Sequence, residues 1–187
     1  MTLLGRILKN RRAGDTHTAW NLPNLHAPGH LTLTSRHFRD GEPIPRAHCA
    51  KTIGGEDLSP HLSWTEPPAG TAALLLVVED IDVPIAKPAV HCLALIDPSH
   101  AHLDPGALHA RQPATGVRLL RSTIGRGYHG PAPIEGHGPH RYIFQLFALA
   151  DPGLGHPAPE RARPRTLLPA VPAPVLARGR LTGTFER

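Results

Sequence analysis

The chain has 187 residues, including 22 prolines and 18 glycines, with only 4% aromatic residues and a formal net charge of +5. This length suits one domain, which can bury roughly 70% of its unfolded surface and needs no disulfide or metal to support a core. The basic residues are dispersed, and no recognition helix or basic strand interleaved with aromatic residues is evident, so nucleic-acid binding is not expected. The composition instead predicts a loop-rich domain with an aliphatic core.

The N-terminal 30 residues mix charge, proline and glycine with little periodicity, which predicts an extended arm before a single domain over residues 31–187. The arm lacks the apolar stretch of a secretory signal, and no window approaches the length of a membrane span. Cys49 and Cys92 lack the spacing of a disulfide framework, and Cys92 lies in an apolar run as a small buried residue would. We therefore expect a cytoplasmic protein without integral membrane association.

Apolar runs separated by turn signals predict several strands. Apolar and polar residues alternate over Leu31–Ser35, as in a half-buried strand. The longest runs are continuously apolar, as in strands buried on both faces. The predicted strands are Leu31–Ser35, Leu62–Trp64, Ala72–Val78, Ala89–Ile96, Val117–Leu120, Tyr142–Leu149 and Arg180–Phe185.

Helix is expected only near the C-terminus, over Glu160–Ala170 and Val175–Ala177. Four prolines between residues 164 and 174 limit any long helix there. Many strands and few helices favour a mostly β fold, an antiparallel β-sandwich with a few short peripheral helices.

Two aspartates, two positions apart, follow the Ala72–Val78 run in the segment Glu79-Asp80-Ile81-Asp82-Val83-Pro84. Asp80 and Asp82 point the same way if strand geometry persists, and crowding would raise the pKa of one of them unless His or Arg neutralises the pair. Pro84 restricts Val83 and fixes where the chain turns. The alternative is a solvated acidic strand end.

A loop rich in glycine and proline, from Gly130 to Pro139, leads directly into His140-Arg141-Tyr142 and an apolar strand. Glycine lets backbone N–H groups approach a ligand, and histidine and tyrosine add donors that can meet an anion. On a regular strand Arg141 faces away from its two neighbours, where it could pair with a structural carboxylate. Tyr142 could equally be core packing. The segment is consistent with the rim of a small anion pocket.

His91 lies near the start of the Ala89–Ile96 run, where a histidine is either a satisfied core residue or a ligand-binding group. Together with the segments above, it resembles the phosphatidylethanolamine-binding protein family, in its bacterial branch related to Raf kinase inhibitor protein. The resemblance rests on four segments in order, which are Leu58–Trp64, Pro68–Gly70, Glu79–Pro84 with His91, and Gly127–Pro131 through His140–Tyr142.

The resemblance implies a large antiparallel sheet packed on a smaller one and a surface pocket for phosphate-like anions. It implies that the pocket is lined or shaped by Asp80, Asp82, Pro84, His91, Gly130, Pro131, His140 and Tyr142. Ile81, Cys92 and Ile134 depart from the family pattern, which affects the rigidity and apolar lining of the pocket rather than its polar groups. Neither a cofactor nor a resident metal is implied.

The resulting hypothesis is a non-enzymatic binding protein for phosphate or a phosphorylated headgroup, which could regulate a partner protein and could form a homodimer. Protonated His91 and His140 would offset the carboxylates, so phosphate affinity is predicted to weaken from about pH 6 to about pH 8.

An Asp/His-dependent hydrolase of small esters or phosphoesters is the alternative, with Asp80 and His91 activating water. The nucleophile elbow, P-loop and Rossmann fingerprints are lacking. Asp80, Asp82 and His91 could also form an incidental metal site, although the 14 histidines show no metal-ligand spacing. The wider family includes protease and kinase inhibitors, but this chain alone selects no such target.

Overall fold

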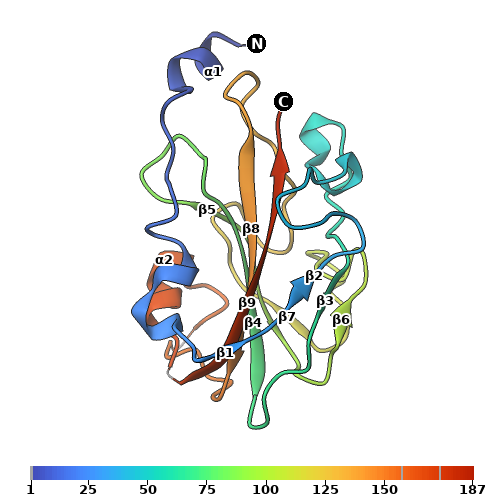
Figure 1. Ribbon diagram of the computed structural model, residues 1–187, viewed down its shortest axis with the longest axis vertical. Helices are drawn as coiled ribbons and strands as arrows, with labels where there is room; N and C mark the ends of the chain where they lie inside the picture. Colours follow the sequence, from blue (N-terminus) through green and yellow to red (C-terminus); the bar gives the residue numbers. More distant parts are fainter. Residues whose placement is uncertain (1, 157, 173) are drawn as a thin grey trace.

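The large sheet is the frame on which the rest of the molecule is built. The computed structural model describes residues 2–156, 158–172 and 174–187. Within them, this sheet has six strands in the order β1 (Gly29–His30), β9 (Val175–Phe185), β8 (His140–Leu149), β4 (Ala73–Asp80), β5 (Ala89–Ile96) and β7 (Val117–Leu119) (Figure 1). Neighbouring strands are antiparallel except β1, which runs parallel to β9.

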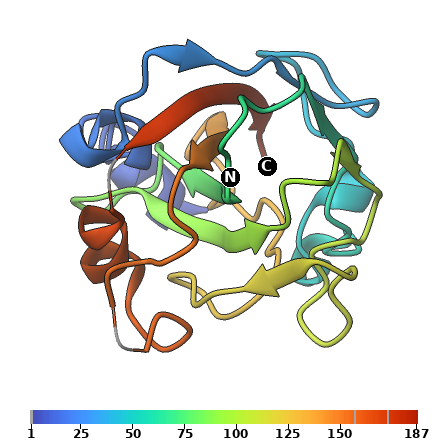
Figure 2. The same cartoon turned by 90° about the horizontal axis from the view of Figure 1, so that it is seen from below.

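A smaller sheet packs against one face of the large one. It has the order β2 (Leu33–Thr34), β3 (Leu62–Trp64) and β6 (His102–Leu103), with antiparallel pairing. The opposite face of the large sheet is covered by α2 (Pro164–Leu167) with η5 (Leu168–Ala170), and by the turns η1 (Ala19–Asn21) and η2 (Pro23–Leu25) (Figure 2). The mostly β fold with two sheets and few short helices is confirmed.

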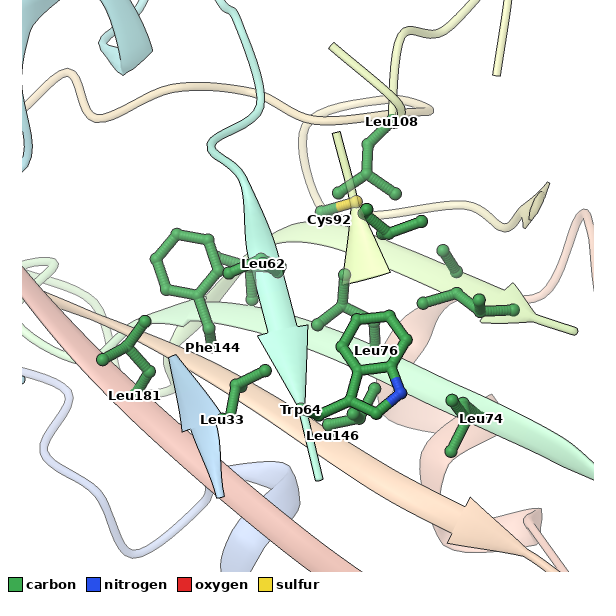
Figure 3. Close-up of a cluster of buried hydrophobic side chains, with 14 of the residues drawn as sticks. Leu33, Leu62, Trp64, Leu74, Leu76, Cys92, Leu108, Phe144, Leu146 and Leu181 are labelled. Carbon is green, nitrogen blue, oxygen red and sulfur yellow. The ribbon is translucent and has the colours of Figure 1, made fainter. Parts of the chain in front are cut away.

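Strand β4 shows why its sequence is continuously apolar. Leu74, Leu76 and Val78 face the small sheet and join the cluster drawn in Figure 3, which also contains Trp64. Leu75, Val77 and the other alternate residues face the second cluster, beneath α2 and the N-terminal turns. Successive side chains of a strand point to opposite faces, so a strand with a core on each side has no polar face.

The strand predictions are confirmed in position, and two of them in full length, β3 and β5. Strand β8 begins at His140, two residues before the predicted start, and so includes all of His140-Arg141-Tyr142. The helix predicted at Val175–Ala177 is wrong, because these residues begin β9, where Val175 pairs with Leu149 of β8. Helix near Glu160–Ala170 is confined to α2 and η5, where prolines interrupt the run.

The N-terminal segment, predicted as an extended arm, contains the helix α1 (Leu3–Leu8) as well as η1 and η2. Thr2 caps α1 by accepting a hydrogen bond from the Gly5 N–H at 3.2 Å. Helix α1 lies at the end of the molecule where β8 begins, beside the loop that precedes β8 (Figure 1). Across the described ranges, no helix is long and apolar enough to cross a membrane.

Two further turns, η3 (Arg46–His48) and η4 (Lys51–Ile53), lie between β2 and β3 along the chain. Their backbone reaches the loop before β8, where the Ala50 N–H donates to the Pro131 carbonyl at 3.0 Å. This contact brings the residues around 50–57 to the same end of the sheet as the start of β8.

Candidate functional site

A cavity of about 430 Å³ lies at one end of the large sheet. It forms where β4 ends at Asp80, β5 begins at Ala89 and β8 begins at His140, with loops closing its sides. Much of the wall is apolar, and its polar members are Thr52, Asp57, Asp80, His91, His129 and His140. Cavities of this size accept small ligands or the headgroup of a larger one.

The predicted site residues converge on this cavity. Those on its lining are Asp80, Pro84, His91, Gly130 and His140. The remaining three, Asp82, Pro131 and Tyr142, lie outside the lining.

A β-bulge places His91 in the cavity wall. In the pairing of β4 with β5, Cys92 lies opposite Val78 and Val90 lies opposite Glu79, so His91 is the additional residue. Cys92 belongs to the core on one face of the sheet and Val90 to the core on the other, although they are two residues apart. The bulge therefore reverses the strand alternation at His91, which is a common way to direct a side chain at a functional site.

The hydrogen bonds of His91 fix its tautomer. Its Nδ1 lies 2.8 Å from the carbonyl oxygen of His129, which can only accept, so Nδ1 carries the proton. Within the described residues Nε2 has no hydrogen-bond partner. Burial lowers the pKa of His91 from 6.5, and this outweighs the opposing effect of Asp80. A neutral His91 therefore presents a lone pair at Nε2.

Asp80 and His140 form a buried pair between β4 and β8. His140 Nδ1 lies 2.7 Å from Asp80 Oδ2, and the other carboxylate oxygen accepts the Asp82 N–H at 2.8 Å. The second ring nitrogen of His140, Nε2, lies 2.7 Å from His137 Nδ1. Both nitrogens of His140 are therefore engaged within the protein.

Asp82 has a different role from Asp80, because it faces two arginines. Its carboxylate accepts from the Arg141 backbone N–H and from both Nε and NH2 of the Arg141 guanidinium, each at 2.8 Å. Arg12 approaches the same carboxylate to 3.0 Å. Burial alone would raise the pKa of Asp82, but the hydrogen bonds from Arg141 and Arg12 hold it below 3.8. Arg141 thus pairs with a structural carboxylate, as its position on the strand had suggested from the sequence.

Tyr142 supports His91 through its ring. The two rings meet edge to face, with centroids 5.3 Å apart. The hydroxyl is buried without a hydrogen bond of ordinary geometry, and burial together with the neighbouring Asp80 carboxylate raises the pKa of Tyr142. The hydroxyl therefore stays protonated, and the residue acts as packing behind the cavity wall.

Gly130 and Asp57 form another part of the cavity wall. A Cβ on Gly130 would lie 2.3 Å from the Cys49 carbonyl carbon and 2.4 Å from the His48 carbonyl oxygen, so only glycine fits there. The Gly130 N–H donates to Asp57 Oδ1 at 2.8 Å, and is therefore occupied by the protein itself.

The sequence interpretation missed Asp57, which adopts a φ of 52°. A positive φ in a residue other than glycine leaves little trace in a single sequence.

The charges around the cavity are unusual for an anion site. Among the described lining residues there are two carboxylates, Asp57 and Asp80, and no lysine or arginine. In the part of the chain that the structure describes, no group of three or more His, Cys, Asp or Glu side chains is placed to hold a metal ion. Asp82, one member of the incidental metal set considered from sequence, is directed at arginines instead.

Nucleophilic and acid–base chemistry receive little support from this geometry. Burial raises the pKa of Cys49 to about 11 and that of Cys92 to about 12, so both thiols stay protonated. The aspartate–histidine pair is Asp80 with His140, whose second nitrogen is bonded to His137 rather than open to a water molecule. The carbonyl of His129, not Asp80, orients His91.

Comparison with known proteins gives a consistent match. A family model described as "Phosphatidylethanolamine-binding protein" matches residues 34–186. A UPF0098 protein of Aquifex aeolicus is 34% identical over 158 residues, covering 84% of this chain and 89% of the relative. A protein of Mycobacterium tuberculosis named as a putative lipoprotein, LppC, is 34% identical over 157 residues, covering 83% of this chain and 72% of that protein.

Among solved structures, the chain is similar to Escherichia coli YbcL, described as a member of the mammalian PEBP family. The TM-score is 0.74 at 25% sequence identity, with 85% of this chain and 99% of that chain covered.

Proposed function

This chain belongs to the phosphatidylethanolamine-binding protein family, and we propose that its cavity binds phosphate or the phosphorylated headgroup of a lipid together with one proton. The observation that carries the proposal is the free Nε2 of His91 in a wall without lysine or arginine. Binding rather than turnover is the function that this geometry supports best.

The proton is required because the empty cavity offers mainly acceptors. The neutral His91 presents a lone pair, and Asp57 and Asp80 present carboxylates. An anion oxygen placed against Nε2 would face another acceptor, which costs the desolvation of both groups. A proton between Nε2 and the anion, on either partner, turns this repulsion into a charge-assisted hydrogen bond.

The sign of the pH dependence follows from the lowered pKa of His91. In the empty cavity the pKa of His91 lies below 6.5, so the ring is neutral at higher pH. At such a pH a proton must be taken up when the anion binds. Affinity then falls by up to about tenfold for each pH unit over that range. Phosphate affinity is therefore expected to weaken between about pH 6 and about pH 8.

Calorimetric titration with phosphate and with phosphoethanolamine tests the proposal. His91→Gln removes the titrating ring, and we expect it to lower phosphate affinity at about pH 6 by about tenfold to a hundredfold and to flatten the pH profile. His109→Gln is the matched control, because His109 is exposed and outside the cavity lining. Wild-type protein that binds neither compound, or a variant that keeps affinity and pH profile, would refute the proposal.

Regulation of a partner protein and formation of a homodimer stay predictions. The expected cytoplasmic location also stays a prediction, since one relative carries the name of a putative lipoprotein. The hydrolase alternative is tested by assaying the wild type and both variants for turnover of small esters and phosphoesters. It requires that the wild type is active, that His91→Gln loses this activity and that His109→Gln keeps it.

A further inference from the structure

His137 is a buried histidine that does not line the cavity, yet it touches the cavity's own histidine. It lies in the loop before β8, and its side chain is fully buried. On one side, Nδ1 lies 2.7 Å from His140 Nε2, with the two rings edge to face at 4.8 Å. On the other side, Nε2 lies 2.8 Å from the Leu8 carbonyl oxygen and 3.1 Å from that of Arg11.

These contacts form one continuous chain of hydrogen bonds. It runs from the backbone of the N-terminal segment through His137 and His140 to Asp80. We infer that His137 is a positioning residue, and that it couples docking of the N-terminal segment 2–14 to the protonation, and hence the charge, of the cavity pair His140–Asp80.

The coupling follows from counting protons. The carbonyls of Leu8 and Arg11 only accept, so His137 Nε2 must carry one proton. The contact between the two rings requires one more, and the contact between His140 and Asp80 requires a third.

If His137 and His140 were both neutral and Asp80 were ionised, the three groups would hold only two exchangeable protons and a net charge of −1. The complete chain of hydrogen bonds needs three protons, so the three groups together have a net charge of zero. If that proton leaves, two buried acceptors face each other at 2.7 Å, and one bond of the chain is lost.

The N-terminal segment is held to two of the loops that form the cavity. The N–H groups of Ala13 and Gly14 donate to the carbonyls of Val83 and Ile81 at 2.9 and 2.8 Å. At Gly5, a Cβ would lie 2.2 Å from the Glu135 carbonyl oxygen, so α1 packs against the loop before β8 without space for a side chain.

Arg12 adds a further attachment, with a hydrogen bond to the Pro139 carbonyl at 2.9 Å in addition to its ion pair with Asp82. The segment thus joins residues 81–83 to residues 135–139. Its release would remove the acceptors of His137 and loosen both loops together.

Other charged or titratable groups surround the chain and set its response to pH. From the arm, Arg12 contacts the His137 carbonyl; from β5, His91 acts on His140 through space; and from β8, the Tyr142 ring stacks on His140. Asp82, Arg141 and Glu135 lie on the adjoining loop and strand positions.

Hydrogen exchange of the full-length protein from about pH 6 to about pH 9 tests the inference directly. Protection factors are measured at Ala13 and Gly14, whose amides report docking without any ligand. We expect protection in the wild type to fall by about tenfold or more as the pH rises and the third proton is lost. His137→Phe keeps a ring of similar size but breaks the chain, so its protection should be lower and independent of pH.

Two further variants separate docking from the histidine itself. Gly5→Leu should push α1 away from the backbone of residues 135–137, which its side chain would meet, and should lower protection although the His137 imidazole is retained. Leu4→Gln changes an exposed position of the same helix and should behave as the wild type. Wild-type protection that does not vary with pH, or His137→Phe protein with wild-type protection, would overturn the inference.

The consequence for the ligand rests on the proposed function. With the arm docked, the chain of His137, His140 and Asp80 has no net charge, so Gly5→Leu should weaken phosphate binding several-fold by leaving the charge of Asp80 unbalanced. Should wild-type protein bind no phosphate, the proposed function fails, and the exchange measurements still decide the role of His137.

Discussion

Asp80 and Asp82 are separated by one residue, but their carboxylates face different charged groups. Asp82 faces Arg141 and Arg12, two groups that stay charged at any physiological pH. Asp80 faces His140, whose charge depends on a proton. The loop at Asp82 is therefore held by ion pairs of fixed charge, whereas the contact at Asp80 depends on the placement of a proton.

The end of β4 separates the two side chains. The Ile81 N–H still bonds to the Arg141 carbonyl at 3.2 Å, but the chain leaves the ladder there, and Asp80 Oδ1 accepts the Asp82 N–H. This local turn sends Asp82 toward the arginines instead of into the cavity. Strand alternation alone would have put both carboxylates on one face.

Asp82→Asn should produce the largest change, by weakening the permanent pair. We expect a loss of about 2 to 3 kcal/mol in the free energy of unfolding, measured by urea denaturation at neutral pH. Because folding lowers the pKa of Asp82, its contribution is present above the ordinary value of 3.8 and disappears as the pH falls through the folded value. The difference between variant and wild type should therefore shrink in acid.

Glu66→Gln serves as the control for this prediction, since Glu66 is exposed and lies outside the cavity lining. Equal stabilities of Asp82→Asn and wild type at neutral pH would remove the distinction between the two aspartates.

Gly130→Ala should disturb the cavity wall rather than either carboxylate. The added methyl would meet backbone atoms of His48 and Cys49, which cannot move independently. We expect a destabilisation of about 1 to 3 kcal/mol by thermal or urea unfolding, together with weaker phosphate binding. Gly153→Ala is the matched control, because the nearest atom there belongs to the Asp151 side chain, which is exposed. Similar effects of the two substitutions would count against a rigid wall at Gly130.

Tyr142→Phe should have the smallest effect. The ring that packs on His91 is kept, and the hydroxyl that is removed has no hydrogen bond of ordinary geometry. We expect the free energy of unfolding to change by less than about 0.5 kcal/mol and phosphate affinity by less than about twofold. A large loss of affinity would show that the hydroxyl reaches the ligand, as a donor on the cavity side.

Much of the fold was predictable because its longest strands have simple signatures. The apolar runs of β4 and β5 follow from burial on both faces, and Leu62–Trp64 from its turn signals. Strands β1 and β6 have two residues each, too few to show a period. Val175–Ala177 looked helical in isolation, and only its pairing with β8 makes it a strand.

The site was predictable in its residue types but not in its connections. The convergence of Asp80, His91 and His140 came from a family resemblance. The bulge that directs His91, the positive φ of Asp57 and the contact of His137 with the N-terminal backbone depend on tertiary pairing. A sequence pattern carries no record of which carbonyl meets which imidazole nitrogen.

Proton uptake on anion binding shows directly whether the anion enters the cavity together with a proton on His91. Sulfate is the suitable anion, because it does not change its own protonation near neutral pH. Calorimetry at about pH 7.5, repeated in buffers of different ionisation enthalpy, gives the number of protons taken up per sulfate bound. We expect a value near one in the wild type and near zero in His91→Gln. Sulfate binding to the wild type without any proton uptake would contradict it.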